Sequence, residues 1–278
     1  MSRNNPFTSR KIPRIGQGTW EMEHDTDPVQ ALRQGLDLGL THIDTAEMYG
    51  DGAVESIIGE ALSGRRDEVF LVSKVLPNNA SKRGTVEACE RSLRALQTDR
   101  LDCYLLHWPG SEPVEHTVAA FEALKEAGKI LSYGVSNFDV PDLEEFAAVA
   151  GTDNIACNQV LYHPGERAAE NRVIPWCQER EIPVVAYSPF GHGPLPGQNT
   201  PIGKALSQVA HEQDTSRHQI ALMFATRFPG LWTIPKASTP VHIADNAQAL
   251  GKTLTPAQAG FLDAALPRNT RARGLPML

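Results

Sequence analysis

The stretch GLTHIDTAEMYG, residues 39–50, decides which fold the sequence predicts. A short apolar run ends in Asp44, and Tyr49 follows five residues later, beside Gly50 and Gly52. An acid after an apolar run fits poorly in a core strand, but it fits the mouth of a parallel barrel, where a strand gives way to a loop. The glycines allow that loop to turn tightly around the tyrosine. Taken alone, an Asp in this position is more often a helix cap or a turn residue.

The rest of the chain alternates between short apolar runs and amphipathic segments. Helices are predicted over 28–38, 54–62, 85–96, 113–127, 141–150, 167–180, 202–212, 217–228, 241–250 and 256–266, with Asp27 and Thr85 among the N-caps. About eight strand–helix units in succession predict class α/β, a (β/α)8 TIM barrel in which 1–278 form a single domain. A G-x-G-x-x-G turn is absent after the first strand, which argues against a Rossmann fold. Residues 7–15 are predicted to form a small hairpin that closes the barrel floor.

Composition restricts the classes of partner. The chain has 278 residues, a net charge of −7 and no block of like charge, so a nucleic-acid partner is not expected. No apolar run approaches the roughly 18 residues of a membrane span, and the N-terminus lacks a signal-peptide core. The four cysteines lie far apart in the sequence, at positions 89, 103, 157 and 177. Reduced, structural cysteines in a cytoplasmic protein are the expectation.

Polar residues recur where the apolar runs end. Seven runs end in or next to such a residue, in the order Asp44, Lys74, His107, Asn137, Gln159, Tyr187 and Lys236. The first three intervals are 30, 33 and 30 residues, about one strand–helix unit each. In a parallel barrel these ends meet on one face, where such barrels place their active sites. The sequence therefore predicts one shared site.

The residue types at these positions indicate acid–base chemistry. A lysine ammonium close to Tyr49 favours the phenolate and lowers the tyrosine pKa, and Asp44 keeps Lys74 charged. His107 can donate a hydrogen bond that orients a carbonyl oxygen. The sequence has no H-E-x-x-H metal motif and no G-x-S-x-G nucleophile elbow, so neither a metal site nor a nucleophilic serine is predicted. A proton donor of this kind requires a source of electrons, and a nicotinamide cofactor is the natural one.

The motifs of the sequence resemble those of a known family. The runs GLTHIDTAEMYG, VFLVSK, LDCYLLHWP, GKILSYGVSNF, NQVLYHP, VAYSPFG and IPKAST are similar to the motifs of aldo-keto reductases, in the same order and over essentially the whole chain. The similarity is greatest to the bacterial branch that contains methylglyoxal reductases and 2,5-diketogluconate reductases. The resemblance implies a barrel that binds NADPH without a Rossmann fold and reduces small aldehydes and ketones.

The resemblance also assigns roles to individual residues. It makes Asp44, Tyr49, Lys74 and His107 the catalytic tetrad. The cofactor residues it implies are Ser136, Asn137 and Gln159 at the carboxamide, Tyr187 on the nicotinamide, Ser188 and Phe190 at the pyrophosphate, Lys236, Ser238 and Thr239 at the 2′-phosphate, and Asp245 and Asn246 at the adenine. Trp20 and Trp108 are implied to line the substrate pocket, and no metal is implied.

One cofactor position departs from the family pattern, and two other functions stay open. His242 stands where the family often has Arg, so NADPH is expected to be preferred while NADH stays usable. One alternative is a cofactor-binding regulatory subunit with little turnover, although the intact tetrad speaks against it. Another is an aldolase that forms a Schiff base on Lys74. The family pattern implies a monomer.

Overall fold

The computed structural model describes residues 5–271 and 274–278, and its centre is a sheet of eight parallel strands. The strands are β1 (Gln17–Gly18), β2 (His42–Asp44), β3 (Phe70–Val75), β4 (Cys103–Leu106), β5 (Tyr133–Ser136), β6 (Ile155–Leu161), β7 (Val184–Tyr187) and β8 (Leu231–Ile234). Each strand pairs with the next one in the sequence, so the sheet order is the chain order. This is the arrangement that repeated strand–helix units produce.

Backbone hydrogen bonds between the ends of the sheet close it into a barrel. Gly16 N donates to Thr233 O at 2.8 Å, and Gly18 N donates to Pro235 O at 3.0 Å. In the opposite direction, Thr233 N donates to Arg14 O at 2.8 Å. The segment around β1 is thereby joined to β8, and the predicted (β/α)8 barrel is confirmed.

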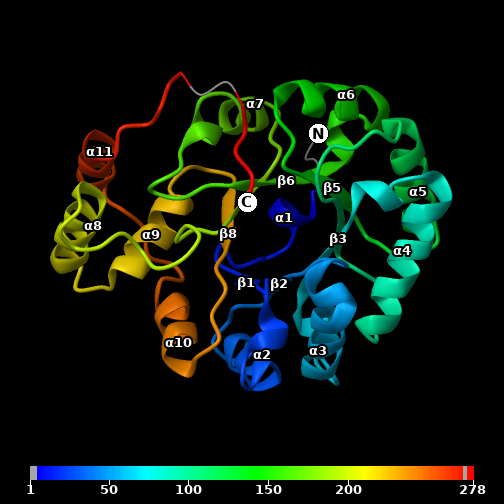
Figure 1. The fold of residues 1–278 in the computed structure, drawn as a ribbon, viewed down its shortest axis with the longest axis horizontal. Coiled ribbons are helices and arrows are strands. Elements are labelled where there is room, and N and C mark those ends of the chain that lie inside the picture. The colour runs from blue at the N-terminus through cyan, green and yellow to red at the C-terminus, as the bar shows by residue number, and fades with distance from the viewer. Residues whose placement is uncertain (1–4, 272–273) are drawn as a thin grey trace.

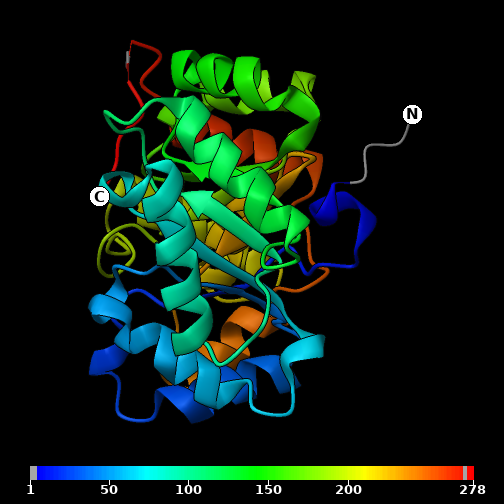
Figure 2. The same cartoon turned by 90° about the vertical axis from the view of Figure 1, so that its right-hand side faces the viewer.

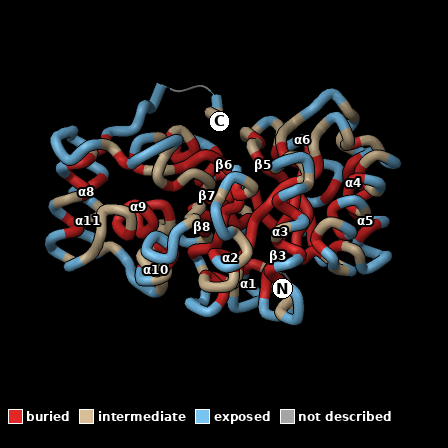
Figure 3. The backbone as a smooth tube through the Cα atoms, turned by 60° about the horizontal axis from the view of Figure 1, so that its bottom comes forward, coloured by how far each residue is buried: buried red, intermediate tan, exposed pale blue. Residues whose placement is uncertain are grey.

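Helices surround the barrel (Figure 1). They are α2 (Pro28–Asp37), α3 (Ala53–Ala61), α4 (Lys82–Ala95), α5 (Val114–Glu126), α6 (Val140–Ala150), α7 (Val173–Glu179), α8 (Pro201–Glu212), α9 (Arg217–Ala225), α10 (Pro240–Gln248) and α11 (Pro256–Ala265). Buried residues concentrate in the strands and on the inward sides of the helices (Figure 3). One apolar cluster lies between barrel and helices, and a smaller one, which includes Val72, Leu105 and Trp232, fills the barrel. Leucine, valine and tryptophan side chains inside a barrel make it a packed core rather than a pore.

Two expected caps have different outcomes. Asp27 caps α2 as predicted, because its side chain accepts a hydrogen bond from Gln30 N while Pro28 occupies the first turn. Thr85 does not cap α4. The cap is Ser81, which accepts from Gly84 N, and Thr85 is buried within the helix. The helix begins one turn earlier than predicted because serine is the better cap at that boundary.

The predicted hairpin over 7–15 is wrong, although the segment does close the barrel floor, the end formed by the amino ends of the strands. Residues Pro6–Ser9 form the short helix α1, whose cap Asn5 accepts from Phe7 N. Phe7 is 2% exposed and packs edge-on against the rings of Phe70 and Trp232, at 4.9 and 5.3 Å. Figure 2 shows α1 at one end of the barrel and the last residues of the chain at the other.

The single helix predicted over 167–180 is also wrong. The structure has a 3-10 turn over Ala168–Glu170 and then α7. Pro175 lacks the N–H that would bond to the carbonyl of Asn171, so an uninterrupted helix cannot pass through this stretch. The four cysteines are free and buried, as expected for structural thiols.

Candidate active site

Three buried side chains from β2, β3 and β6 form a hydrogen-bonded chain at the barrel mouth, the end formed by the carboxyl ends of the strands. Lys74 Nζ donates to Asp44 Oδ1 at 2.5 Å and to Thr45 O at 2.8 Å. Gln159 Nε2 donates to Asp44 Oδ2 at 2.7 Å. Lys74 is completely buried, and Asp44 and Gln159 are almost so. The structure therefore brings these three residues together, as the strand-end pattern predicts.

Tyr49 lies within hydrogen-bond distance of the same lysine. Lys74 Nζ is 3.3 Å from Tyr49 Oη and 5.0 Å from the centre of the ring. The tyrosine begins a 3-10 turn, η2 (Tyr49–Gly52), in which Gly50 and Gly52 have φ values of 55° and 88°. Both values are in the left-handed region that glycine adopts without strain, so the glycines shape the turn as predicted.

The ionisation of this pair differs from the sequence expectation. Burial raises the pKa of Tyr49, and Lys74 offsets this rise only in part, so the net direction is upward rather than downward. Burial also disfavours the charged form of Lys74, but Asp44 and Tyr49 outweigh it, and the net pKa of the lysine is raised. At neutral pH the site holds a protonated tyrosine beside a charged lysine.

His107, directly after β4, completes the cluster. It is 8% exposed, and its ring centre is 6.0 Å from that of Tyr49. Burial, reinforced by the charge of Lys74, lowers the pKa of His107 to about 2. Within the described chain its Nδ1 has no hydrogen-bond partner. The imidazole is thus neutral and donates from only one ring nitrogen.

Two tryptophans stand beside these reactive groups. Trp20 is 44% exposed and packs edge-on against Tyr49 at 5.0 Å between ring centres. Trp108 is partly buried, and its ring is 4.8 Å from that of His107. Both positions border the tyrosine–histidine pair, as expected for walls of a small pocket.

Amide and hydroxyl groups occupy the ends of β5 and β7. Tyr187 Oη donates to Asn137 Oδ1 at 2.9 Å, and Asn137 Nδ2 donates to His107 O at 3.1 Å. Ser136 Oγ donates to Gln159 O at 3.0 Å. Asn137 has a φ of 61°, a left-handed conformation that is uncommon for a non-glycine residue. Such strained positions cluster at functional sites, and this one lies where the sequence predicts cofactor contacts.

The loop after β8 and the start of α10 provide groups suited to an anion. Thr239 caps α10, because its Oγ1 accepts from His242 N at 3.3 Å. His242 and Thr239 are exposed, and Ser238 and Lys236 are partly exposed. A lysine beside the N-terminus of a nine-residue helix is a chemical match for phosphate. The donor types here and at the ends of β5 and β6 fit a phosphorylated nicotinamide dinucleotide.

Lys236 has a partner that the sequence did not indicate. Its Nζ lies 3.0 Å from Asp25 Oδ1 and 3.1 Å from Glu21 O. Asp25 is 211 residues away in sequence, in the loop after β1. The one available signal was the acidic composition of that loop, which reads WEMEHD over 20–25.

Asp245, one of the two residues expected at the adenine, contacts the first turn of α9 and its cap. Asp245 accepts from Ser216 Oγ and from Gln219 Nε2, both at 2.7 Å. Phe190 is partly exposed and packs edge-on against His218 at 4.9 Å, an aromatic contact that sequence reasoning did not identify. The other two residues expected at the cofactor are Asn246, which is buried, and Ser188, which is partly exposed and has a φ of 49°.

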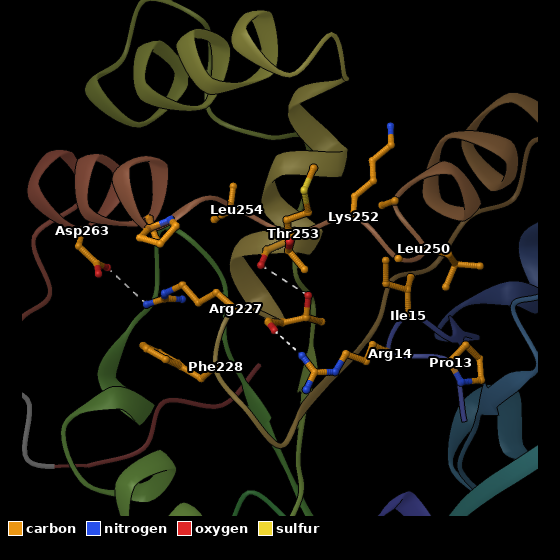
Figure 4. A pocket seen from close by; sticks show the side chains of 16 residues that line it. Pro13, Arg14, Ile15, Arg227, Phe228, Leu250, Lys252, Thr253, Leu254 and Asp263 are labelled. Carbon is orange, nitrogen blue, oxygen red and sulfur yellow. Dashed lines mark hydrogen bonds and ion pairs between the residues drawn. The ribbon is translucent and has the colours of Figure 1, made fainter. Parts of the chain in front are cut away.

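A cavity of about 490 Å³ lies away from the mouth, between α9, α11 and the segment before β1 (Figure 4). Arg14, Arg227, Phe228, Leu250 and Lys252 are among its lining residues, and none of the predicted site residues lines it. Arg14 donates across it to Thr226 O at 3.1 Å. Its size does not make it the active site, because the acid–base groups lie at the mouth.

Residues 5–271 and 274–278 contain no group of three or more His, Cys, Asp or Glu side chains placed to hold a metal ion. Over the same residues, no helix combines the length and apolarity needed to cross a membrane.

Comparison with known proteins places the chain in a family. The family model described as "Aldo/keto reductase family" matches residues 14–267. Methylglyoxal reductase YeaE of Escherichia coli strain K12 is 46% identical over 260 residues, which cover 92% of each protein. The aldo/keto reductase of Klebsiella pneumoniae solved with NADP and acetate is 43% identical, with a TM-score of 0.90 over 96% of each chain.

A structure described as a putative 2,5-diketo-D-gluconic acid reductase B is 28% identical, with a TM-score of 0.82 over 96% of this chain and 93% of that one. The matches extend along nearly the whole chain, over the barrel and over every strand that contributes to the mouth. The chain belongs to the aldo/keto reductase family.

Proposed function

We propose that this chain reduces small aldehydes and ketones to alcohols with NADPH, and that methylglyoxal-type dicarbonyls and aromatic aldehydes are its best substrates. Keto-sugars are a further candidate class. Family membership supports the reaction, and the Escherichia coli relative named methylglyoxal reductase supports the substrate class. The Klebsiella pneumoniae relative solved with NADP supports the cofactor.

The observation that carries the proposal is the buried contact of Lys74 Nζ with both Asp44 Oδ1, at 2.5 Å, and Tyr49 Oη, at 3.3 Å. NADPH, when bound, would supply the hydride that reduces the carbonyl group. Tyr49 holds the proton that the developing alkoxide takes up, and its raised pKa keeps that proton in place until it is needed. As the proton leaves, the Lys74 ammonium stabilises the phenolate, and Asp44 keeps the lysine charged.

The remaining mouth residues are assigned to positioning. His107 is neutral, so a hydrogen bond from its ring orients the carbonyl oxygen without competing as an acid. Trp20 and Trp108 border a pocket for small substrates. We assign Ser136, Asn137, Gln159 and Tyr187 to the nicotinamide, Ser188 and Phe190 to the pyrophosphate, Lys236, Ser238, Thr239 and His242 to the 2′-phosphate, and Asp245 and Asn246 to the adenine. The same proposal includes a monomer in the cytoplasm with no nucleic-acid or membrane partner.

The aldolase alternative conflicts with the state of Lys74. A Schiff-base lysine must present a neutral amine, which requires a lowered pKa. Here the pKa of Lys74 is raised, and its ammonium donates to Asp44, Thr45 and Tyr49. No observation favours the regulatory alternative, since all four residues assigned to catalysis lie together at the mouth.

The test is Tyr49→Phe, which removes only the proton donor. We expect kcat with methylglyoxal to fall at least ~100-fold, because general acid catalysis is worth about that much or more. NADPH affinity, measured by fluorescence titration, should stay within about twofold, because the hydroxyl contributes to the transition state rather than to cofactor binding.

Tyr104→Phe is the matched control. Tyr104 is completely buried, and its hydroxyl has no hydrogen-bond partner within the described chain, so the same deletion is made where it should not affect catalysis. Its kcat should equal that of the wild type. If Tyr49→Phe retained more than about a tenth of the wild-type rate, Tyr49 would not be the general acid.

A further inference from the structure

The loop after β1 is firmly attached to the site. Thr19 is completely buried and donates from Oγ1 to Asp44 O at 2.8 Å. Met22 is 1% exposed and belongs to the main apolar cluster. Between them Glu21 has a φ of 57°, a left-handed conformation that requires support from its surroundings. The loop is therefore held in one shape next to the catalytic aspartate.

This shape places Asp25 against Lys236. The Asp25 side chain is 10% exposed, the Lys236 side chain is 30% exposed, and 3.0 Å separates Oδ1 from Nζ. The pair joins the loop after β1 to the loop after β8, across the seam where the barrel closes. Glu21 O accepts a second hydrogen bond from Lys236, at 3.1 Å. The lysine assigned to the cofactor phosphate thus already forms an ion pair with a carboxylate of the protein.

The second carboxylate oxygen of Asp25 is a further observation. Asp25 Oδ2 is buried and has no hydrogen-bond partner among the described residues. An unsatisfied buried acceptor carries a desolvation cost that a donor from a ligand can remove. In Rossmann-fold enzymes, which have a different architecture, a carboxylate near the adenosine binds the ribose 2′-hydroxyl of NADH, and the same chemistry disfavours the 2′-phosphate of NADPH.

We propose that Asp25 determines cofactor specificity: it competes with the 2′-phosphate of NADPH for Lys236 and so limits the preference for NADPH over NADH. The inference rests on the proposed function. Two anions then share one lysine, so NADPH binding must either displace Asp25 or bring its phosphate close to a carboxylate. Either event makes the binding of NADPH less favourable, and it does not affect NADH, which lacks the phosphate.

The experiment measures binding by isothermal titration calorimetry, with 2′,5′-ADP and 5′-AMP as probes alongside NADPH and NADH. Asp25→Asn keeps the shape of the side chain and removes its charge. We expect affinity for 2′,5′-ADP and NADPH to rise about three- to tenfold, the range for a partly exposed charged contact. Affinity for 5′-AMP and NADH should be unchanged or reduced.

Two controls separate the contact from general electrostatics. Glu23→Gln removes the same charge from the same loop, and within the described chain no hydrogen bond or ion pair joins Glu23 to Lys236. The Glu23 side chain is 21% exposed, so it matches Asp25 in being largely buried, and without a contact to Lys236 its loss should change the affinity ratio less than twofold. In a Lys236→Met background, Asp25→Asn should lose most of its effect on 2′,5′-ADP, because the two residues act through one contact.

The outcomes distinguish failure of this inference from failure of the proposed function. A wild-type protein that binds neither dinucleotide would contradict the function itself. Wild-type binding of NADPH with equal effects of Asp25→Asn and Glu23→Gln would overturn the role of Asp25 alone. A loss of NADPH affinity in Asp25→Asn would also overturn it, because it would mean that Asp25 orients Lys236 toward the phosphate instead of competing for it.

Discussion

The mouth and the floor of this barrel each bury a histidine, and only one of the two lies among reactive groups. At the floor, His42 is completely buried between the rings of Phe7 and Phe70, at 5.8 and 5.6 Å. At the mouth, His107 lies beside Tyr49, and the charge of Lys74 acts on it. Burial lowers the pKa of both, to about 4 for His42 and about 2 for His107.

The comparison shows that a strongly shifted pKa does not by itself identify a catalytic residue. Neither ring nitrogen of His42 has a hydrogen-bond partner within the described chain, and its neighbours are aromatic. The shift at the floor is therefore mainly a consequence of burial, while the charges of Asp44, Lys74 and Asp102 act on His42 more weakly. At the mouth the same physical cause acts on a residue that faces a proton donor and a charged lysine, so the neighbours identify the function.

The substitution Phe7→Ala at the floor is expected to have the largest effect, because it should lower stability without changing the activity at the mouth. This change removes a ring that is 2% exposed and packs against Phe70 and Trp232 inside the barrel. The free energy of unfolding should fall by about 3–5 kcal/mol, as for other buried aromatic side chains. The kcat/KM of the protein that remains folded should stay within about twofold, because the acid–base groups lie at the other end.

Urea denaturation and steady-state kinetics of the same preparation would measure both quantities. Phe261→Ala in α11 is the matched control, since that ring is 36% exposed and its loss should cost less than about 1 kcal/mol. If Phe7→Ala reduced activity in proportion to stability, the two ends of the barrel would not be independent.

The next effect concerns stability in acid. The pKa of His42 is about 4 in the folded chain and about 6.5 in the unfolded chain, so the unfolded state binds the proton first as the pH falls. Above about pH 6.5, His42 is neutral in both states and does not reduce the free energy of unfolding. As the pH falls from about 6.5 to about 4, the free energy of unfolding decreases by about 3 kcal/mol. His107 adds a loss of the same sign, which begins at the same pH, is larger and continues toward about pH 2.

His42→Leu removes one of these titrations, so unfolding free energies at pH 7 and pH 4.5 should differ less in the variant than in the wild type. An identical dependence in His42→Leu and the wild type would contradict the burial argument.

The sequence predicted the fold and the meeting of the polar strand-end residues because both follow from where strands end. Asp44, Lys74 and Gln159 meet because parallel strands bring their carboxyl ends to one face. The contact of Asp25 with Lys236 could not be predicted in this way. It depends on the loop after β1, where Glu21 adopts a left-handed conformation that its residue type does not favour.

One other error came from a quantity that pattern alone does not contain, and two came from signals that the sequence did contain. The direction of the Tyr49 pKa depends on how deeply the ring is buried, and burial outweighs the effect of Lys74. The error at α1 was avoidable, since Asn5 followed by Pro6 is a recognised start of a helix. The interruption before α7 was similarly indicated by Pro175.

The smallest expected effect is at the edge of the mouth, where His242→Arg should change cofactor preference without changing stability. His242 is exposed in the first turn of α10, next to Thr239 and the loop that contains Lys236. Arginine offers a permanent charge and a planar fork that matches phosphate. Because solvent screens an exposed contact, the ratio of kcat/KM for NADPH to that for NADH should widen only about two- to fivefold at pH 8.

Most of this change should come from a lower KM for NADPH, because the phosphate contributes to binding rather than to hydride transfer. His211→Arg in α8 makes the same change of charge at another exposed position and serves as the control. If His242→Arg and the control gave the same ratio, position 242 would not face the cofactor phosphate. Combined with Asp25→Asn, the two effects should multiply if each acts on the phosphate separately, and a smaller product would mean that they compete for one contact.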